Sequence, residues 1–488
     1  MNFNSQAFLL FFPIVVLVHY IIPKKVRYIW LLFASYYFYM SWNPKYAFLM
    51  AIVTITTWLA GNLLEKYRSR SELNRKIIIA ACIVFNLCIL GVFKYLGFVI
   101  ENMRKAAYVL QLAFSAPTVD IILPVGISFY TFQAIGYVID VYRGDVKAER
   151  NVLKYGLFIS FFPQLVAGPI ERSKNLLKQI NEENDFDYQN ARNGLLLMMW
   201  GFFEKIAVAD KAAVIVDSIY SNYMDYSGSV IMLATVLFAF QIYCDFGGYS
   251  HIAIGAAKVL GIHLSDNFRQ PYYAVSIKDF WKRWHISLSN WLRDYLYIPL
   301  GGNRGGKLLK NRNLLITFMI SGLWHGAGWN YIVWGGLHGF YSVMSGMTQA
   351  IRKKCVQILR INTKCFSWRL FQRSITFALV TFAWMFFRAS GMRDAVDMLG
   401  LVIFRFDFSH LFRQNVFLLS SNRQLTAGIL LIMMVDGMNV RGYRVRELLD
   451  KQNIIFRWLC YIALLLYLLI CVLQNYGAPA SRFIYFQF

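Results

Sequence analysis

One of the seven histidines in this sequence, His325, stands in a setting that suits chemistry. It lies in the run Ser321-Gly-Leu-Trp-His-Gly-Ala-Gly-Trp329, inside a mostly apolar stretch, where small neighbours leave room for a substrate. An ionisable side chain within a membrane is costly to keep and is therefore a functional candidate. The alternative interpretation is a buried histidine that is hydrogen-bonded to a backbone carbonyl.

A second candidate, His285, lies in a segment that is both charged and aromatic, Phe280 to Tyr295. This segment is too charged to span a membrane and too aromatic to be a free loop. Its pattern predicts an amphipathic helix at the interface, with Trp and Lys/Arg at headgroup depth. On that pattern alone, interfacial packing is the simpler interpretation of His285. Arg283, Arg293 and Asp294 are either a buried ion-pair network or interfacial anchors.

Metal chemistry is not expected from these residues. His325 and His338 are 13 positions apart, about 19 Å along a helix and more than half a turn out of register. No HxxxH or HExxH spacing occurs, and the seven cysteines form no CxxC pair. Asp185 and Asp187 form the one D-x-D candidate for a metal-dependent sugar-nucleotide site, but acidic pairs are common by chance in polar loops.

The chemistry that fits is acyl transfer. A histidine in a water-poor cavity, with no Ser or Cys nucleophile motif nearby, suits a general base that removes a hydroxyl proton as the oxygen attacks an acyl carbon. The stretch from Arg269 to Arg312 holds nine Lys/Arg against two acids. Such a basic stretch would attract an anionic donor, for example a phosphate-bearing thioester carrier.

The elements that position these residues are membrane helices. The chain has 488 residues, 58% of them hydrophobic and only 16% charged, whereas about a quarter of residues are charged in soluble proteins. A crossing needs about 20 apolar residues, and runs of this kind predict about ten or eleven crossings. Examples are 46–64, 77–100, 121–139, 375–387 and 454–473. The net charge of +24 resides in short loops between such runs, which argues against nucleic acid as a partner.

Loop charge predicts the orientation of the chain. Residues 7–22 form a retained first helix with no Lys or Arg before it, and basic residues follow it from Lys24. The positive-inside rule therefore places the N-terminus outside. It places the basic stretches 269–312, 352–373 and 441–457 in the cytoplasm and the C-terminal tail outside.

The run from Asn313 to Met347 is predicted to enter the membrane and return. Its 35 residues would measure about 52 Å as one helix, which is too long for one pass. Both flanking stretches are cytoplasmic by charge, and the glycines at 322, 326, 328, 335, 336 and 339 permit a break. Broken backbone at membrane depth is tolerated where it is buried or lines a cavity, so a cavity is expected around His325.

Several motifs together resemble the membrane-bound O-acyltransferase family. The closest likeness is to its bacterial alginate O-acetylase branch, and the D-alanyl transferase of teichoic acid modification is a more distant relative. The motifs are Gln241-Ile-Tyr-Cys-Asp-Phe-Gly-Gly-Tyr-Ser250, Asn267-Phe-Arg-Gln-Pro-Tyr272, Phe280 to Tyr295, Tyr297-Ile-Pro-Leu-Gly-Gly-Asn-Arg304, Gly322-Leu-Trp-His-Gly326 and Trp334-Gly-Gly-Leu-His-Gly339. Further stretches, at 124–132, 162–172, 384–389 and 483–488, extend the likeness along nearly the whole chain.

The resemblance implies an all-α polytopic fold: one domain over 1–488, with helices in a ring around a central tunnel, plus re-entrant and interfacial helices. We divide it into N-terminal helices (7–240), a catalytic core (241–347) and C-terminal helices with an aromatic tail (348–488). The resemblance makes His325 the catalytic histidine and His285 its second characteristic histidine. His251 departs from the common pattern, which has Asp there, and is interpreted as structural. The residues expected to line or support the tunnel are Trp324, Asp245, Tyr249, Arg283, Arg293, Asp294 and Asn303.

The resemblance also implies the substrates and partners. We expect a multi-pass protein of the bacterial cytoplasmic membrane that holds no bound cofactor. It would export an acetyl group from acetyl-CoA, or from an acyl-carrier thioester, toward an extracellular polysaccharide with the help of an extracytoplasmic acyltransferase partner. The aromatic tail at 483–488 is expected to dock into a groove. There the Tyr485 hydroxyl would relay the acyl group, or the tail would only anchor at the interface.

Other functions remain open from sequence alone. A teichoic-acid D-alanyl transferase would use a carrier-protein thioester. A transporter or flippase would also have broken helices and a central polar site, but transporters commonly carry such features in both halves, and here the polar residues concentrate once, between Gln241 and His338. A membrane glycosyltransferase would need Asp185 and Asp187.

Overall fold

The computed structural model describes residues 1–112, 122–410, 420–474 and 483, and these residues fold into helices without any strand. The predicted all-α class is confirmed. The chain divides into two compact units, Met1–Met198 with Ser250–Asp266 and Met199–Tyr249 with Asn267–Phe488. Helix α12 (Gly228–Val259) belongs to both. Most of the 241–347 segment, including His285 and His325, therefore lies in the second unit.

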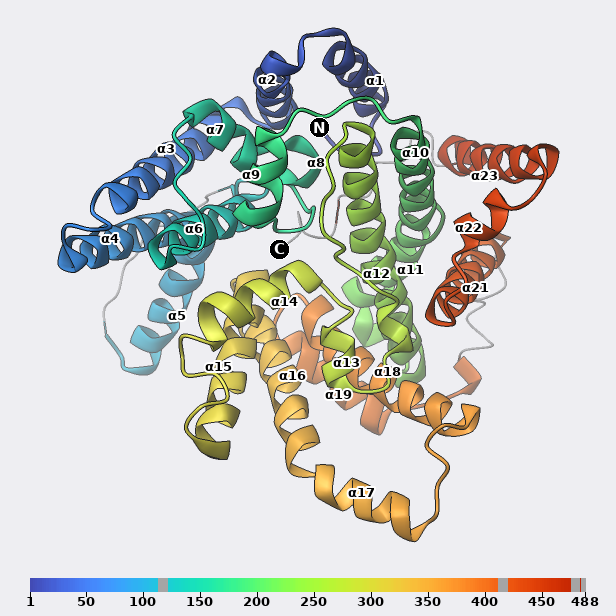
Figure 1. Ribbon diagram of the computed structural model, residues 1–488. Coiled ribbons are helices and arrows are strands. Elements are labelled where there is room, and N and C mark those ends of the chain that lie inside the picture. The colour runs from blue at the N-terminus through green and yellow to red at the C-terminus, as the bar shows by residue number, and fades with distance from the viewer. Residues whose placement is uncertain (113–121, 411–419, 475–482, 484–488) are drawn as a thin grey trace. The chain divides into compact units, whose positions relative to one another are not determined.

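The first unit is built around helix α6, which is buried along most of its length. Helices α3 and α4 both pack against α6, and α2 packs against α7, as Figure 1 shows. A π-helical turn joins α4 to α5 without a break. The helices of this unit are α1 (Gln6–Ile21), α2 (Arg27–Met40), α3 (Pro44–Lys66), α4 (Glu72–Leu90), α5 (Leu96–Val109), α6 (Ile127–Arg143), α7 (Val152–Ser160), α8 (Phe162–Leu165), α9 (Ser173–Asn181) and most of α10 (Tyr188–Phe202).

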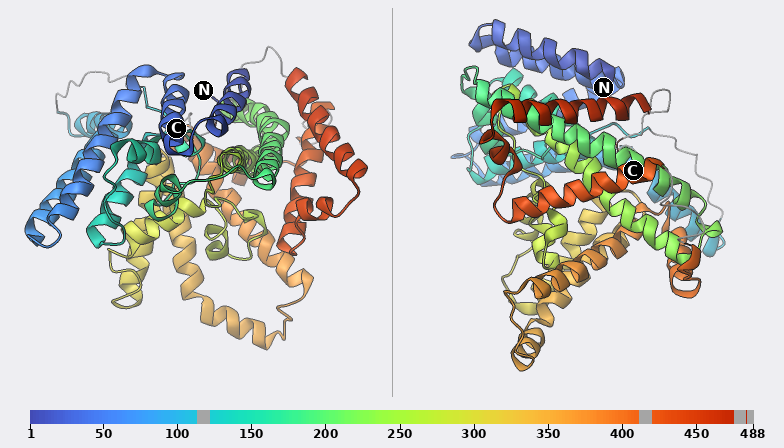
Figure 2. Two further views of the ribbon diagram at one scale, coloured as in Figure 1. Left: turned by 45° about the horizontal axis from the view of Figure 1, so that its top comes forward. Right: turned by 90° about the vertical axis from the view of Figure 1, so that its right-hand side faces the viewer.

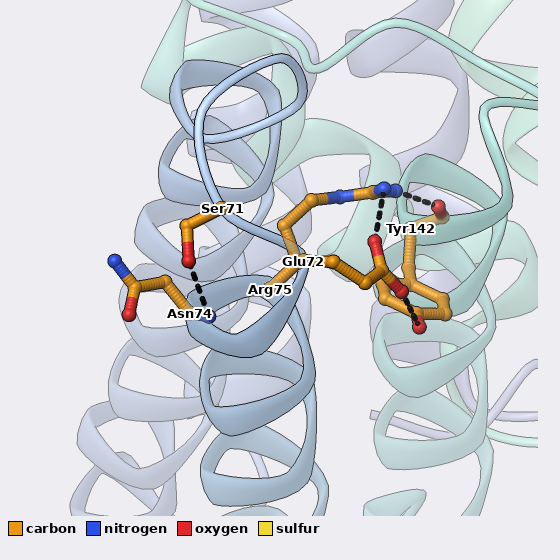
Figure 3. Close-up of polar contacts among 5 residues, drawn as sticks. All are labelled: Ser71, Glu72, Asn74, Arg75 and Tyr142. Atoms are coloured by element: carbon orange, nitrogen blue, oxygen red, sulfur yellow. Dashed lines mark hydrogen bonds and ion pairs between the residues drawn. The ribbon is translucent and has the colours of Figure 1, made fainter.

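Polar contacts tie the start of α4 to the end of α6 (Figure 3). Ser71 caps α4, because its hydroxyl accepts the backbone N–H of Asn74 at 3.2 Å; such caps typically contribute about 1 kcal/mol. Glu72 accepts from Arg75 and from the Tyr142 hydroxyl, each at 2.9 Å. Arg75 also donates to the Tyr142 carbonyl. The basic turn between α3 and α4 is thereby held in one place.

The second unit contains a helical hairpin, α15 and α16, which packs against α18. The two hairpin helices lie side by side in Figures 1 and 2. The helices of this unit are α11 (Asp210–Ser221), most of α12, α13 (Ile277–Trp281), α14 (Ile286–Leu292), α15 (Gly306–His325), α16 (Trp329–Met347), α17 (Gln349–Ile358), α18 (Phe366–Arg388), α19 (Met392–Phe404), α21 (Ser420–Val440), α22 (Val445–Asp450) and α23 (Ile454–Gln474), with π-helical turns η3 (Phe203–Ala209) and η6 (Arg293–Tyr297).

Among the described residues, five helices are long and apolar enough to cross a membrane: α3, the continuous α4–α5 helix, α12, α18 and α23. Their burial differs widely, because 83% of the most apolar stretch of α12 is buried but only 11% of that of α23. α12 is thus enclosed by protein, while α23 presents apolar side chains outward, as a helix in contact with lipid does. The larger number of crossings indicated by the sequence stays a prediction.

Candidate active site

His325 lies at the point where the hairpin turns. α15 ends at His325, and the chain reverses through 326–328 before α16 begins, so the predicted reversal of the chain is confirmed, while its entry into the membrane stays a prediction. Glycine is required at the crossing of the two helices. A Cβ on Gly322 would lie 2.1 Å from the carbonyl oxygen of Tyr331, and a Cβ on Gly335 would meet the carbonyl of Phe318 at the same distance.

Aromatic rings surround the His325 imidazole, which is only 3% exposed. Its ring centroid lies 4.9 Å from that of Trp324, 5.0 Å from Trp334 on α16 and 5.4 Å from Phe387 on α18. These rings come from three helices of the second unit. They form an apolar wall that excludes water and strengthens electrostatic interactions at the imidazole.

His285 lies at a second break. Residues 280–295 do not form the single interfacial helix that their composition predicts, because α13 ends at Trp281 and α14 begins at Ile286. Between the two, His285 adopts a left-handed backbone with φ of 43°, which is uncommon and costly for a residue other than glycine. This turn directs His285 inward, where it is fully buried. The interfacial interpretation of His285 was therefore wrong.

Asn267 fixes the orientation of the His285 imidazole. Its Oδ1 atom lies 3.1 Å from His285 Nδ1 and accepts the backbone N–H of Ser287 at 3.4 Å and its hydroxyl at 2.9 Å. Because a backbone N–H can only donate, this Asn267 atom is the oxygen, and His285 Nδ1 must carry the proton. The lone pair is then on Nε2. The backbone N–H of Ile286 also donates to the Asn267 carbonyl at 3.0 Å.

His285 is uncharged in the folded protein. It lies outside the spanning helices, and burial lowers the pKa of its imidazole to about 3. At neutral pH its Nε2 can accept a hydrogen bond or a proton. The role of Asn267 could not be predicted from the sequence, although this residue stands in one of the family motifs, because its partner is 18 positions away.

The structure brings the two histidines together. Their ring centroids are 6.2 Å apart, and Trp324 lies 5.8 Å from His285. Phe246 of α12 packs edge-on against His285 at 4.7 Å. One imidazole is supplied by the end of α15 and the other by the junction of α13 and α14, both in the second unit. A buried pair of imidazoles can accept a hydroxyl proton and hold a second polar group of a substrate nearby.

A third buried histidine, His338, braces this aromatic wall. Its Nδ1 accepts the indole N–H of Trp281 at 3.3 Å, and its ring lies 5.1 Å from that of Trp334. Across the described part of the chain, no group of three or more His, Cys, Asp or Glu side chains could hold a metal ion.

Two of the predicted support residues on α12 make contacts that are clear in the structure. Asp245 forms a buried ion pair with Lys205 at 2.6 Å, and Lys205 also pairs with Asp210 at 2.8 Å. Tyr249 packs against Phe483, with ring centroids 4.5 Å apart. Phe483 is 2% exposed, so docking of the tail is confirmed at this residue. Tyr485 lies outside the described residues.

The other predicted support residues are near the surface. Arg283 pairs with Asp279 at 2.9 Å, and both are about one quarter exposed. Arg293 pairs with Asp294 at 2.7 Å, with the arginine more than half exposed. Asn303 accepts the hydroxyl of Tyr297 at 2.7 Å in an exposed position. None of these contacts involves either histidine, and the ion pairs that the described residues show here are partly exposed rather than a buried network.

Comparison with known proteins indicates the family of this chain. Residues 147–392 match the family of membrane-bound O-acyltransferases. The chain is 39% identical over 401 residues to a probable alginate O-acetylase of Pseudomonas syringae, covering 82% of this chain and 74% of the relative. It is 34% identical over 437 residues to the peptidoglycan O-acetyltransferase of Helicobacter pylori, covering 82% and 79%. A teichoic acid D-alanyltransferase of Streptococcus thermophilus is 33% identical over 242 residues, 45% and 56% of the two chains.

These matches, with the apolar helices, define a multi-pass membrane acyltransferase. The chain belongs to the membrane-bound O-acyltransferase family, on its alginate O-acetylase-like branch. Both buried histidines lie within the part that matches the family.

Proposed function

We propose that this enzyme moves an acetyl group from a cytoplasmic thioester donor across the membrane for O-acetylation of an extracellular polysaccharide, with His325 as its catalytic residue. The observation that carries the proposal is the pair of buried imidazoles whose centroids lie 6.2 Å apart. Two imidazoles are costly to bury and are kept close where they act on one substrate.

The proposed acyl transfer needs only the side chains of His325 and His285. His325 removes the proton from the acceptor hydroxyl as its oxygen bonds to the acyl carbon. The carbon–sulfur bond of the thioester then breaks, and the sulfur leaves as a thiol after taking the proton back from His325. His285 presents Nε2, which can only accept while the ring is neutral, and orients an O–H or N–H group of a substrate.

Charge and the names of the relatives support the proposed donor and acceptor. The loops rich in Lys and Arg at 269–312 suit the phosphates of acetyl-CoA or of a phosphopantetheine carrier, and positive-inside orientation makes these loops cytoplasmic. One relative is named as a probable alginate O-acetylase and another as a peptidoglycan O-acetyltransferase. We place this enzyme in the bacterial cytoplasmic membrane, with both termini outside and an extracytoplasmic partner that completes the transfer.

The C-terminal tail is proposed as the relay. Phe483 packs on Tyr249 and Phe246 of α12, and Phe246 in turn contacts His285. Tyr485 is two residues further along the chain, and its hydroxyl would accept the acyl group and pass it outward. Acyl mass on the C-terminal peptide during turnover with donor, in the absence of the partner, is the expected result, and its absence would count against the relay.

The other sequence-based functions are less well supported. Asp187 caps α10, because its carboxylate accepts the backbone N–H groups of Gln189 and Asn190 at 2.7 and 3.1 Å. Asp185 pairs with Lys24 at 2.5 Å. Both carboxylates thus have structural partners, which does not favour a glycosyltransferase. A carrier-protein thioester donor, as in a D-alanyl transferase, is the alternative that the assay below resolves.

The test is thioester cleavage by the purified protein in nanodiscs, with release of free CoA from acetyl-CoA as the readout. We expect release by the wild type and none by a folded His325→Ala variant, with a candidate acceptor added if the basal rate is low. His263→Ala, a change at an exposed histidine, is the matched control and should release CoA normally. Full activity of His325→Ala would overturn the assignment. Activity only with a carrier-protein thioester would change the donor.

A further inference from the structure

A basic cavity of about 340 Å³ lies within the first unit, between the end of α1, the start of α2 and residues of the α9–α10 connection. Its volume is within the range of ligand-binding pockets, roughly 300–1,000 Å³. The proposed acyl transfer makes no use of it. The charged residues that line it are four cations, Lys24, Lys25, Arg27 and Lys154, and two carboxylates, Glu182 and Glu183.

A buried histidine on the cavity wall points to a ligand. His19 is 4% exposed and lines the cavity. Neither of its ring nitrogens makes a hydrogen bond of regular geometry, although the backbone of Leu260 lies near the ring. Buried polar side-chain atoms are normally hydrogen-bonded in folded proteins. A ligand oxygen in the cavity would supply the missing partner.

The cations of the cavity are only partly engaged by the protein. Lys24 pairs with Asp185, and Lys154 donates to the side chain of Asn181 at 2.7 Å. Arg27 is held by the carbonyls of Asn184, Ile22 and Tyr20 at 2.6, 3.4 and 3.5 Å, although it forms no ion pair with a described residue. Lys25 is exposed and forms no ion pair with any described residue. The carboxylate of Glu182 is 3.8 Å from Lys178, which lies outside the cavity. This carboxylate is therefore paired with a lysine other than those of the cavity.

The start of α2 adds to the attraction for an anion. This helix has 14 residues, begins at Arg27 and has no side-chain cap. The N–H groups of an uncapped first turn, together with the helix dipole, favour a negatively charged group nearby. The ligand is therefore an anion with several acceptor oxygens, and a phosphate ester fits that description.

A stripe of exposed apolar residues lies on the face of α1 opposite His19 and ends near the lysines of the cavity. Leu10, Ile14, Leu17 and Ile21 recur at spacings of four and three residues, and each is 56–71% exposed. Side chains at this spacing share one face of a helix. The stripe ends within a few residues of Lys24 and Lys25. A lipid whose phosphate binds at these lysines, beyond the end of α1, would have its acyl chains beside this apolar helix.

We propose that this cavity binds the phosphate of an anionic phospholipid, with Lys25, Lys154 and His19 as its contacts and the acyl chains along α1. Loop charge places the site in the cytoplasmic leaflet. The bound lipid would hold the α1–α2 turn against α7 and α9.

The test is native mass spectrometry of the full-length protein in detergent, with phosphatidylglycerol or phosphatidylcholine added. We expect a bound phosphatidylglycerol that phosphatidylcholine does not replace. Lys154→Gln should weaken retention roughly fivefold, and Lys25→Glu roughly 25-fold, since each unit of charge near a lipid headgroup is worth about that factor of five. Lys76→Glu, a reversal at an exposed lysine of the same unit outside the cavity, is the matched control and should retain the lipid.

The outcomes separate the possible sources of phosphate. Binding of inorganic pyrophosphate with no phosphatidylglycerol retained, when the two are present at equal concentration, would support the phosphate site and overturn the lipid as its source. Retention of phosphatidylglycerol in that competition, with loss of retention in both cavity variants, supports the proposal in full. Equal retention of the two lipids, or equal loss in Lys25→Glu and Lys76→Glu, would overturn it. Equal melting temperatures without lipid would show that the variants are folded.

Discussion

The role of Asn267 as a positioning residue for His285 can be tested by removing its side-chain oxygen. In Asn267→Ala, the single oxygen that binds His285 Nδ1 and two donors of Ser287 is lost. The His285 ring can then rotate and exchange its Nδ1 proton for an Nε2 proton. With Nε2 protonated, the ring would donate at the position where the proposed mechanism needs an acceptor.

The magnitude follows from the number of contacts and from comparable sites. Each neutral hydrogen bond contributes about 0.5–1.5 kcal/mol net, so three of them correspond to roughly 2–4 kcal/mol of unfolding free energy. Loss of a residue that orients a functional histidine typically costs about 10–100-fold in function. We therefore expect kcat/KM for thioester cleavage to fall about 10–100-fold, which is roughly 1.4–2.8 kcal/mol of transition-state stabilisation.

Asn267→Asp distinguishes orientation from simple structural support. The carboxylate can accept the same hydrogen bonds, but it stabilises the charged imidazolium and so raises the pKa of His285, which burial lowers to about 3 in the wild type. Below the raised pKa the ring is protonated and cannot accept a proton. The acidic limb of the pH profile of kcat/KM should therefore move to higher pH, while the alkaline side is retained.

A matched control is available on the hairpin. Asn330 is also buried, and its side chain donates to the carbonyls of Phe386 and Ala389. Asn330→Ala should lower the melting temperature without changing the pH profile. If Asn267→Ala loses activity only in proportion to lost stability, and Asn267→Asp keeps the wild-type pH profile, the tautomer reasoning is refuted.

Four further substitutions test the helix crossing of the hairpin, the buried ion pairs and the cap of α10. Gly335→Ala should prevent folding or strongly lower the melting temperature, because the new Cβ would lie 2.1 Å from the Phe318 carbonyl oxygen, whereas Gly336→Ala, with its nearest atom at 3.9 Å, should be tolerated. Lys205→Met should cost about 3–5 kcal/mol in denaturant unfolding, because two carboxylates lose their shared cation; an unchanged midpoint would contradict this. Asp187→Ala should cost about 1 kcal/mol through loss of the α10 cap and leave thioester cleavage intact, and loss of activity at normal stability would revive the sugar-nucleotide hypothesis.

The hairpin could be predicted from the sequence because its signal is local. Thirty-five residues between two basic stretches exceed one membrane crossing, and the glycines at 326 and 328 mark where the chain turns. The all-α class follows in the same way from the apolar runs. The position of His325 at the turn could be anticipated, because it directly precedes the first of these glycines.

The environment of His285 could not be predicted from local patterns. Trp, Lys and Arg around it have the composition of an interfacial helix, yet the structure breaks that helix and buries the residue. The break depends on Asn267, which lies 18 positions earlier and holds both the His285 ring and the Ile286 backbone. Such a contact has no periodic signature in the sequence. The family motifs placed both residues in the resemblance, but they did not indicate that the residues touch.

Both histidines lie at a helix end, His325 as the last residue of α15 and His285 as the residue before α14, and this has a physical reason. Where two helices pack closely, the facing backbones leave no room for a large side chain between them, as at Gly322 and Gly335 in the hairpin. At a helix end, by contrast, the terminal side chain can point along the helix axis toward another segment. A helix end also leaves backbone N–H or C=O groups without helical partners. In a membrane protein, other groups of the protein must form hydrogen bonds with them. At His285 this is done by Asn267, whose carbonyl receives the N–H of Ile286. The same residue thus stabilises the break and selects the imidazole tautomer, so a substitution there should change stability and the pH profile together.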